Sequence, residues 1–447
     1  MSIPVTFVSL GCDKNLIDSE NMLGLLHQAG FQIISDESQA EVIVVNTCCF
    51  IQDAQEESIE NILEMSLYKK EGKCKALIVT GCMAERYKDE IIKEIPEVDG
   101  IVGTTGYDQI VSVIQQTLEG QKVKAFESIH RTINAEVPRV VSTPPHYAYL
   151  KIAEGCNNHC TYCIIPTLRG NYRSRTMESI IQEAETLVER GAKELILVAQ
   201  DTTRYGIDLY GSKTLPKLLE KLCQIKDLHW IRILYCYPEE ITDELIEVMA
   251  KEPKICKYID MPIQHANDQV LKRMGRRSTQ SQLKQVIAKM REEIPGICLR
   301  TTLITGFPGE TEEEFQDMVD FVKEIQFDRL GVFTYSQEEG TKAAEYVNQI
   351  SEEIKQERRN YVMELQQDIS ASLSQQMMGQ TIEILIEGKL PEEEVYCGRS
   401  YKDSPDVDGM VFFPSTEEYL SGEFITVKIK ETDEYDLVGE IVNEYSQ

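Results

Sequence analysis

Three cysteines fall close together near the middle of the chain, in the spacing Cys-x3-Cys-x2-Cys. They are Cys156, Cys160 and Cys163. Three thiolates so near in sequence can wrap one small metal site, either zinc or an iron–sulfur cluster. A closed structural site uses four protein ligands, so three ligands leave one metal corner open for a substrate or cofactor. His159 could supply a fourth ligand, and a zinc knuckle is therefore the structural alternative.

Three more cysteines share a second pattern, because Cys12, Cys48 and Cys82 each come just after a short apolar run. Loops that follow the strands of a parallel sheet converge on one edge, so these thiols could meet there and hold a second open cluster. Taken singly, each is more typical of an ordinary buried thiol. Their matching positions, with Gly11 and Gly81 directly before two of them, favour a shared site. The other cysteines lack such a setting and are interpreted as structural: Cys49, Cys74, Cys223, Cys236, Cys256, Cys298 and Cys397.

The elements that must position the second set alternate short apolar runs with amphipathic helices. The expected strands are 5–10, 42–46 and 76–80, and the first expected helix is 18–29. Continuous apolar strands that alternate with helices indicate a parallel α/β sheet. We therefore expect an N-terminal α/β domain over 1–125.

A proline-containing polar stretch, 126–145, interrupts this pattern and predicts a linker. The next region, 146–375, repeats strand and helix several times, which indicates a partial (β/α) barrel. The first cysteine motif follows its first strand, and loops at that end of a barrel carry its chemistry. The expected strands are 149–153, 195–199, 231–235, 258–261, 299–304 and 329–334.

The last segment, 376–447, has runs of alternating polarity punctuated by glycine and predicts a small antiparallel β-barrel. Its charge is informative, because five Lys/Arg and seventeen Asp/Glu give 5 − 17 = −12. The whole chain of 447 residues carries −29. Such a balance argues against a general nucleic-acid binder and favours a basic partner, or solubility alone. No apolar stretch is long enough to cross a membrane, and cysteine usage without a secretory signal predicts a cytoplasmic protein.

The first cysteine motif, with Tyr162 before its last cysteine, resembles that of the radical S-adenosylmethionine (SAM) superfamily. The resemblance implies that Cys156, Cys160 and Cys163 hold a [4Fe–4S] cluster whose open iron binds SAM. One electron then cleaves SAM into methionine and a 5′-deoxyadenosyl radical, which abstracts hydrogen from an unactivated carbon.

Nearly the whole chain resembles the methylthiotransferases of that superfamily, which replace a C–H bond with C–SCH3. The resemblance implies an auxiliary [4Fe–4S] cluster on Cys12, Cys48 and Cys82 and a C-terminal TRAM barrel. Cys49 departs from the usual pattern, which has glycine there. The patterns that carry the resemblance are Asn46-Thr47-Cys48, Thr80-Gly81-Cys82-Met83-Ala84, Arg169-Gly170 followed by Arg173-Ser174-Arg175, and Gly306-Phe307-Pro308-Gly309-Glu310-Thr311.

Two motifs, at 11–15 and 199–206, resemble the type that modifies an aspartate of ribosomal protein S-twelve to 3-methylthioaspartate. The resemblance implies this basic protein as substrate and an electron donor such as flavodoxin or ferredoxin. The alternative is the type that methylthiolates a modified adenosine of tRNA. The acidic C-terminal segment disfavours tRNA, because it would repel phosphate and attract a Lys/Arg-rich protein.

Several further residues are candidates for contacts with SAM or substrate, each with a structural alternative. Tyr162 could pack on the cluster or adenine, or in the core. Gln200 and Asp201 could hold the SAM ammonium, or Asp201 could cap a helix. The remaining candidates are Gln264 with His265 (a polar pair otherwise), Gly306 (a simple turn otherwise), and Arg173 with Arg175, which could meet a carboxylate or lie on a solvated surface.

Overall fold

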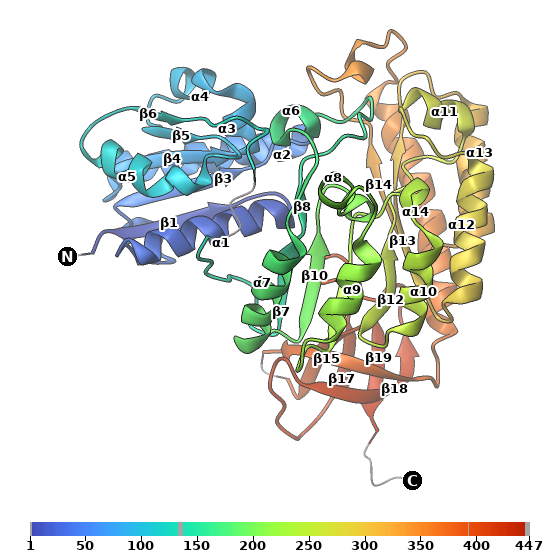
Figure 1. Cartoon of the computed structure of the whole chain (residues 1–447). Coiled ribbons are helices and arrows are strands. Elements are labelled where there is room, and N and C mark those ends of the chain that lie inside the picture. The colour runs from blue at the N-terminus through green and yellow to red at the C-terminus, as the bar shows by residue number, and fades with distance from the viewer. Residues whose placement is uncertain (1, 133–136, 392, 443–447) are drawn as a thin grey trace.

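The computed structural model describes residues 2–132, 137–391 and 393–442. Three sheets divide this chain into an N-terminal α/β layer, a middle sheet flanked by helices, and a small barrel at the C-terminal end (Figure 1). The prediction of a parallel α/β domain, a partial (β/α) barrel and a small β-barrel is therefore confirmed.

The N-terminal sheet has six parallel strands in the order β2-β1-β3-β4-β5-β6. Every residue of β3 and β4 is buried, which explains their continuous apolar sequences. Helices α1 to α5 connect the strands and cover the sheet. The strands are β1 (Pro4–Ser9), β2 (Gln32–Ile33), β3 (Val42–Thr47), β4 (Ala76–Gly81), β5 (Gly100–Val102) and β6 (Val123–Ala125); the helices are α1 (Asp13–Gln28), α2 (Gln52–Glu71), α3 (Cys82–Tyr87), α4 (Asp89–Glu94) and α5 (Ile110–Leu118).

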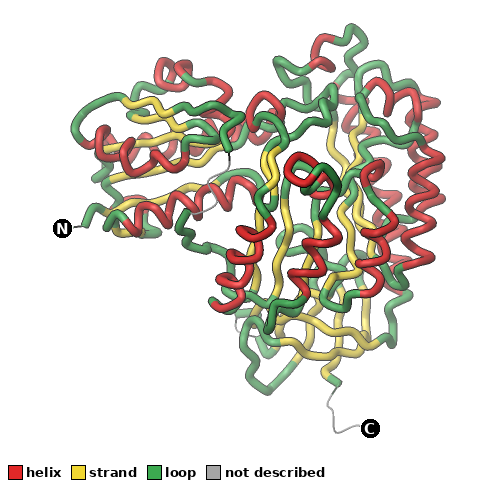
Figure 2. The backbone as a smooth tube through the Cα atoms, viewed as in Figure 1, coloured by secondary structure: helices red, strands yellow, loops and turns green. Residues whose placement is uncertain are grey.

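The middle sheet has six parallel strands in the sequential order β7-β10-β11-β12-β13-β14. In the described part of the chain β7 and β14 do not pair with each other, so the sheet is a partial barrel. Figure 2 shows helices beside its strands. The strands are β7 (Tyr147–Lys151), β10 (Glu194–Val198), β11 (Trp230–Ile233), β12 (Ile255–Asp260), β13 (Cys298–Thr305) and β14 (Arg329–Thr334); the longer helices are α7 (Met177–Glu189), α9 (Leu215–Cys223), α10 (Asp243–Lys251), α12 (Gln280–Glu293), α13 (Glu312–Ile325) and α14 (Glu352–Gln375).

Several short helices and strands lie in the loops between these longer elements. The ribbon of β8 (Ala153–Glu154) and β9 (Arg173–Ser174) is antiparallel and brackets the Cys-x3-Cys-x2-Cys loop. Helix α6 (Ile165–Arg169) follows that loop directly. Two further short helices are α8 (Ile207–Tyr210) and α11 (Asp268–Arg273).

The C-terminal barrel is closed in the order β15-β16-β17-β19-β18. One of its pairings, β17 with β19, is parallel, so the barrel is not wholly antiparallel as the sequence predicted. Its strands are β15 (Thr381–Lys389), β16 (Val395–Ser400), β17 (Val411–Pro414), β18 (Phe424–Thr432) and β19 (Leu437–Ile441).

A buried charge cluster fastens this barrel beneath the middle sheet. Arg232 and Arg399 both pair with Glu194, the first residue of β10, at 2.7 Å. Glu387 of β15 accepts from Arg399 at 2.5 Å and lies 2.7 Å from the His146 ring. Glu194 and His146 lie at the amino ends of β10 and β7, so the C-terminal barrel lies at the end opposite to the cysteine loop (Figure 1).

The predicted linker is held between the two α/β layers. Arg139 pairs with Glu20 of α1 and with Glu183 of α7, and its side chain is buried. Residues 133–136 of the linker lie outside the described residues.

Candidate functional site

The N-terminal cysteines lie at the carboxyl ends of three neighbouring strands, β1, β3 and β4. Cys12 is the N-cap of α1, Cys48 directly follows β3, and Cys82 opens α3. Cys48 and Cys82 are buried and Cys12 is exposed. Burial, reinforced by Cys82 and Cys12, raises the pKa of the Cys48 thiol to about 12. The three thiols are thus close enough to oppose one another's ionisation, and a metal would be needed to hold them as thiolates.

Two glycines make this close approach possible. Gly11 has φ +85°, and a Cβ there would lie 2.7 Å from Cys48 Cβ. Gly81 has φ +91°, and a Cβ there would lie 2.3 Å from Asn46 Oδ1 and 2.6 Å from the Thr47 carbonyl oxygen. Only glycine fits such a crowded left-handed position. The loops beside Cys12 and Cys82 therefore depend on it.

Replacing Gly81 with alanine is expected to remove iron from this N-terminal site and to lower the free energy of unfolding by more than about 2 kcal/mol. Gly120 is the matched control, because its φ is +86° and nothing lies within 4 Å of an added Cβ. Gly120→Ala should show only the left-handed cost of about 1–2 kcal/mol and keep its iron. Iron analysis and urea unfolding of both variants measure the difference, and equal iron in the two would contradict the role of Gly81.

The neighbouring thiol Cys49 faces a different environment. Its side chain is fully buried in an apolar cluster that includes residues of β3 and β4. Its backbone carbonyl oxygen accepts a hydrogen bond from Arg86 Nη1 at 3.2 Å. Cys48 is instead fixed by α2, where Ser58 accepts from the Cys48 N–H at 3.0 Å and donates to its carbonyl at 2.8 Å. These contacts favour Cys48 as the ligand and Cys49 as a structural residue.

The second set, Cys156, Cys160 and Cys163, lies on the loop between β8 and α6. Cys156 and Cys160 are buried and Cys163 is partly buried. Burial raises the pKa of Cys156 to about 11, and burial together with Cys160 raises the pKa of Cys163. Among the described residues no group of three or more His, Cys, Asp or Glu is drawn together tightly enough for a single metal ion.

Helix α6 joins the two sets of cysteines. It begins just after Cys163, and its five residues span about 7 Å. Ile164 and Leu168 pack in the same apolar cluster as Cys82. At its end, Arg169 Nη2 donates to Cys82 Sγ at 3.6 Å and to Asn15 Oδ1. The two sets thus face each other across one short helix at the boundary of the two α/β layers.

A buried polar network continues from Arg169 toward the cysteine loop. The Arg169 guanidinium lies 2.6 Å from Asp18 of α1 and 3.3 Å from Glu154 of β8. Lys151 bridges the same two carboxylates at 2.5 and 2.9 Å. These cations hold the pKa of Glu154 below its usual range despite complete burial. The sequence singles out Arg169 only as part of the Arg169-Gly170 pattern and does not predict a role for Lys151, Glu154 or Asp18. The one signal is Lys151, because a lysine within an apolar strand indicates a buried ion pair.

The motif after Cys12 also touches the middle sheet. Lys14 Nζ lies 3.2 Å from the centroid of the Tyr235 ring, and the Tyr235 hydroxyl donates to Asp13 at 3.1 Å. Asn15 donates to the Leu10 and Thr47 carbonyl oxygens and so fixes the β1 and β3 loops. Residues 13–15 therefore align the first cysteine loop with the end of β11.

Gln200 and Asp201 follow β10, beside the cysteine loop. Gln200 Nε2 donates to Glu154 at 2.6 Å, while its buried amide oxygen has no partner among the described residues. Asp201 accepts from Asn158 at 2.8 Å and from Thr203 at 2.6 Å, and burial raises its pKa to about 6. Asp201 occupies the N-cap position of the next short helix, Thr202–Arg204, but its side chain makes no capping hydrogen bond there. An orphaned acceptor and a buried carboxyl without an ion-pair partner in the described chain fit the amino group of SAM.

The other SAM candidates lie at the same edge of the sheet. Gln264, after β12, has a left-handed φ of +71°, a strained conformation that is enriched at functional sites. The Gly306 N–H donates to Glu310 at 3.1 Å, so this backbone group is already engaged. Tyr162 packs against the apolar cluster of Val270, Met274, Phe307 and Tyr335, and fully buried His265 lies 3.3 Å from Glu310.

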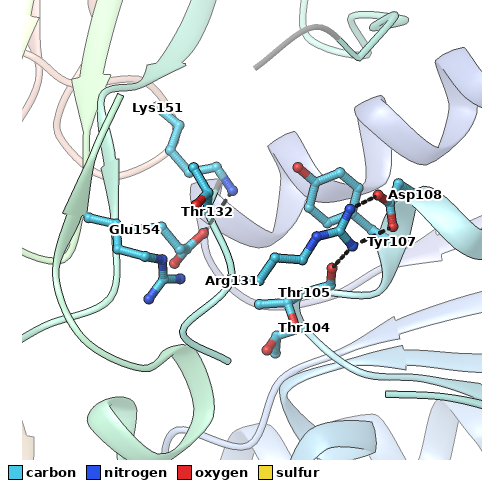
Figure 3. A pocket seen from close by; sticks show the side chains of 9 residues that line it. Thr104, Thr105, Tyr107, Asp108, Arg131, Thr132, Lys151 and Glu154 are labelled. Atoms are coloured by element: carbon cyan, nitrogen blue, oxygen red, sulfur yellow. Dashed lines mark hydrogen bonds and ion pairs between the residues drawn. The ribbon is translucent and has the colours of Figure 1, made fainter. Parts of the chain in front are cut away.

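The two arginine candidates differ. Among the described residues Arg173 donates to the backbone carbonyls of Asn171 and Arg169, and it lines a cavity between the α/β layers. Arg175 is buried and bound to Glu183 at 2.5 Å and to Ser179 at 2.9 Å, so it secures α7 and does not line this cavity. Figure 3 shows the cavity, whose lining also includes Thr104, Thr105, Tyr107, Asp108, Arg131, Thr132, Lys151 and Glu154.

Family models match three parts of the chain. The model described as the uncharacterized protein family UPF0004 matches residues 4–103, that of the radical SAM superfamily matches 150–322, and that of the TRAM domain matches 378–442. No helix among the described residues is both long and apolar enough to span a membrane.

Curated relatives match over nearly the full length. A protein of Lachnoclostridium phytofermentans named "Ribosomal protein uS12 methylthiotransferase RimO" is 55% identical, covering 97% of this chain and 99% of its own. Proteins of the same name from Pelotomaculum thermopropionicum and Clostridioides difficile are 53% and 49% identical, each covering 99% of this chain and 100% and 99% of its own.

Among solved structures, the radical SAM methyltransferase TsrM of Kitasatospora setae with cobalamin and a [4Fe–4S] cluster has a TM-score of 0.54 at 13% identity. The match covers 85% of this chain and 76% of that chain. This likeness concerns the fold alone.

Proposed function

This chain belongs to the RimO family of ribosomal protein uS12 methylthiotransferases, and from that premise we propose that it converts one aspartate of ribosomal protein S-twelve (uS12) to 3-methylthioaspartate. The observation that carries the proposal is the position of two cysteine sets at either end of α6, one of them at the ends of β1, β3 and β4. The family uses SAM and [4Fe–4S] clusters.

We assign the clusters to residues of this chain. Cys156, Cys160 and Cys163 hold the cluster that binds SAM, and Cys12, Cys48 and Cys82 hold the auxiliary cluster. Three thiolates at each leave an open iron. When bound, the clusters and SAM supply the electron, the hydrogen-abstracting radical, the sulfur and the methyl group.

The protein's own residues bind and orient. Gln200 accepts a hydrogen bond from the amino group of SAM, and the Asp201 carboxylate attracts that group. Tyr162 and Gln264 contact the remainder of the molecule, and Gly306 shapes the turn at the same edge of the sheet. Arg173 is positioned to bind a carboxylate at the boundary of the α/β layers, because no carboxylate of the described residues pairs with it. Lys151, Glu154 and Arg169 keep the two cysteine sets in a fixed relation through the buried ion pairs that they form with one another and with Asp18.

The titration of Asp201 leads to a testable pH dependence. Its pKa of about 6 means that the carboxylate needed to attract the SAM amino group is present above that pH and is lost below it. SAM affinity of the reconstituted enzyme is expected to fall as the pH drops through about 6. Asp201→Asn should bind SAM about tenfold more weakly at pH 7.5 and lack this break. Equilibrium dialysis across the pH range measures both, and an identical pH profile for the two proteins would remove Asp201 from the SAM site.

The electrostatics favour a basic protein over tRNA. The segment 376–447 carries −12, which attracts Lys/Arg-rich uS12 and repels phosphate. We also propose that the enzyme works in the cytoplasm, where ribosomes are made, and takes electrons from flavodoxin or ferredoxin.

A substrate competition tests the proposed function. Anaerobically reconstituted enzyme with SAM, reductant and sulfide is offered uS12 and bulk tRNA together, and both are analysed by mass spectrometry. A methylthio group on an aspartate of uS12 is the expected result. A methylthio group on a tRNA adenosine would keep the chemistry but overturn the substrate.

A further inference from the structure

Helix α2 presents an exposed apolar row on the side facing away from the N-terminal sheet. Ile59, Leu63 and Leu67 are 44%, 48% and 50% exposed, at the i, i+4, i+8 spacing that aligns side chains along one helix face. The opposite face of α2 is buried through Ile62 and Met65, at 0% and 5% exposure. The row is about 12 Å long, and an apolar surface of this kind commonly marks a contact site.

An acidic row runs beside the apolar one. Glu56, Glu60 and Glu64 follow one another at i, i+4, i+8 and are all exposed. In the described part of the chain none of the three forms an ion pair with a lysine, arginine or histidine, whereas Lys69 and Lys70 at the end of the helix pair with Asp99 and Glu97. Like charges at this spacing weaken an isolated helix. Among the described residues the one side-chain partner of this row is Gln52, which donates to Glu56 at 2.8 Å.

Helix α2 also contacts the backbone of one residue of the auxiliary cysteine set, Cys48. Ser58, adjacent to Ile59, makes both hydrogen bonds that fix the backbone of Cys48. The first turn of α2 reaches the middle region, where Gln55 donates to Glu338 at 2.7 Å. A partner bound along the outer face would therefore lie on the helix that fixes the backbone of Cys48.

We propose that the outer face of α2 is a docking surface for the basic protein substrate, which would place an apolar segment flanked by lysine or arginine along it. The inference rests on the proposed function. Ribosomal proteins are basic because they bind RNA phosphates, so the three glutamates attract uS12 while the apolar row contacts apolar side chains on its surface. A second copy of this chain does not fit, because a two-fold contact would bring the same three glutamates against each other.

The test compares two variants with the wild type on two substrates. In one variant, Ile59, Leu63 and Leu67 become serine; in the other, Glu56, Glu60 and Glu64 become glutamine. The substrates are intact uS12 and a short peptide containing only its modified loop. For both variants the ratio of kcat/KM for intact uS12 to kcat/KM for the peptide is expected to fall about tenfold. The glutamine variant should also lose most of the salt dependence of this ratio.

A matched control separates docking from net charge. Glu353, Glu357 and Glu364 lie exposed on α14, and no lysine, arginine or histidine of the described chain pairs with them. Changing them to glutamine removes the same charge and should leave the ratio unaltered. Circular dichroism and iron content check that each variant folds.

Each outcome is decisive. A ratio that stays at the wild-type value in the serine variant would overturn the docking surface. An equal fall in the α14 control would reduce the effect to net charge and also overturn it. If the wild type modifies neither substrate, the proposed function fails instead, which is a separate result.

Discussion

Changing Cys12, Cys48 and Cys82 together to alanine is expected to halve the iron of the reconstituted enzyme and to abolish methylthiolation of uS12, while cleavage of SAM continues. The two sets are separate in the fold, because these thiols lie at the ends of β1, β3 and β4. Cys156, Cys160 and Cys163 lie on the loop between β8 and α6. Removing one set of thiolates leaves the other intact. Iron analysis, product mass spectrometry and 5′-deoxyadenosine release measure the three effects.

The reciprocal change and a control complete this experiment. Alanine at Cys156, Cys160 and Cys163 should stop both SAM cleavage and methylthiolation. Cys49→Ala and Cys74→Ala remove buried thiols outside the two sets and should keep the full iron content, with a small stability cost of about 1 kcal/mol. If the Cys12, Cys48 and Cys82 variant retained all of its iron, the assignment of an auxiliary cluster to these residues would be wrong.

Arg169→Met is expected to lower the free energy of unfolding by about 3–5 kcal/mol and to cost the enzyme its auxiliary iron. Arg169 is 2% exposed and lies against Asp18, Glu154 and Cys82. Its loss leaves Lys151 as the one cation that pairs with Asp18 and Glu154 among the described residues, and uncompensated buried charge is strongly destabilising. The cost falls on the boundary between the two α/β layers, and urea unfolding measures it.

Arg131→Met is the control for this change. Arg131 also makes a charged pair, with Asp108, but its side chain is 35% exposed and solvent screens the interaction. Its removal should cost no more than about 1 kcal/mol. Arg169→Lys keeps a cation without the guanidinium geometry and should give an intermediate loss. Equal unfolding midpoints for Arg169→Met and Arg131→Met would show that the buried network does not hold the layers together.

The fold could be predicted from the sequence where both faces of a strand are completely buried. Strands β3 and β4 are buried at every residue, and their uninterrupted apolar runs predicted a parallel sheet. The carboxyl ends of such strands must share an edge, which predicts that Cys12, Cys48 and Cys82 lie at the same edge. The parallel pairing of β17 with β19 had no such signal, because short alternating strands fit either direction.

The site was less accessible because its partners come from distant segments. Asp18, Lys151 and Arg169 meet only after the two layers pack, and their sequence separations of 133 and 151 residues hide the pairing. Arg173 and Arg175 look equivalent in sequence, yet one lines the cavity and the other pairs with Glu183. The direction of a side chain at a strand end depends on its neighbours, which periodicity does not give.

We expect this chain to take a hydrogen from the β-carbon of an aspartate in uS12. Deuterium transfer follows that step, with uS12 carrying aspartate deuterated at that carbon and anaerobically reconstituted enzyme. Deuterium should appear in the released 5′-deoxyadenosine and a methylthio group on the same aspartate, both absent when Cys156, Cys160 and Cys163 are alanine. Methylthiolated uS12 that retains all its β-deuterium, or 5′-deoxyadenosine without deuterium, would show that this chain does not take the hydrogen from that carbon.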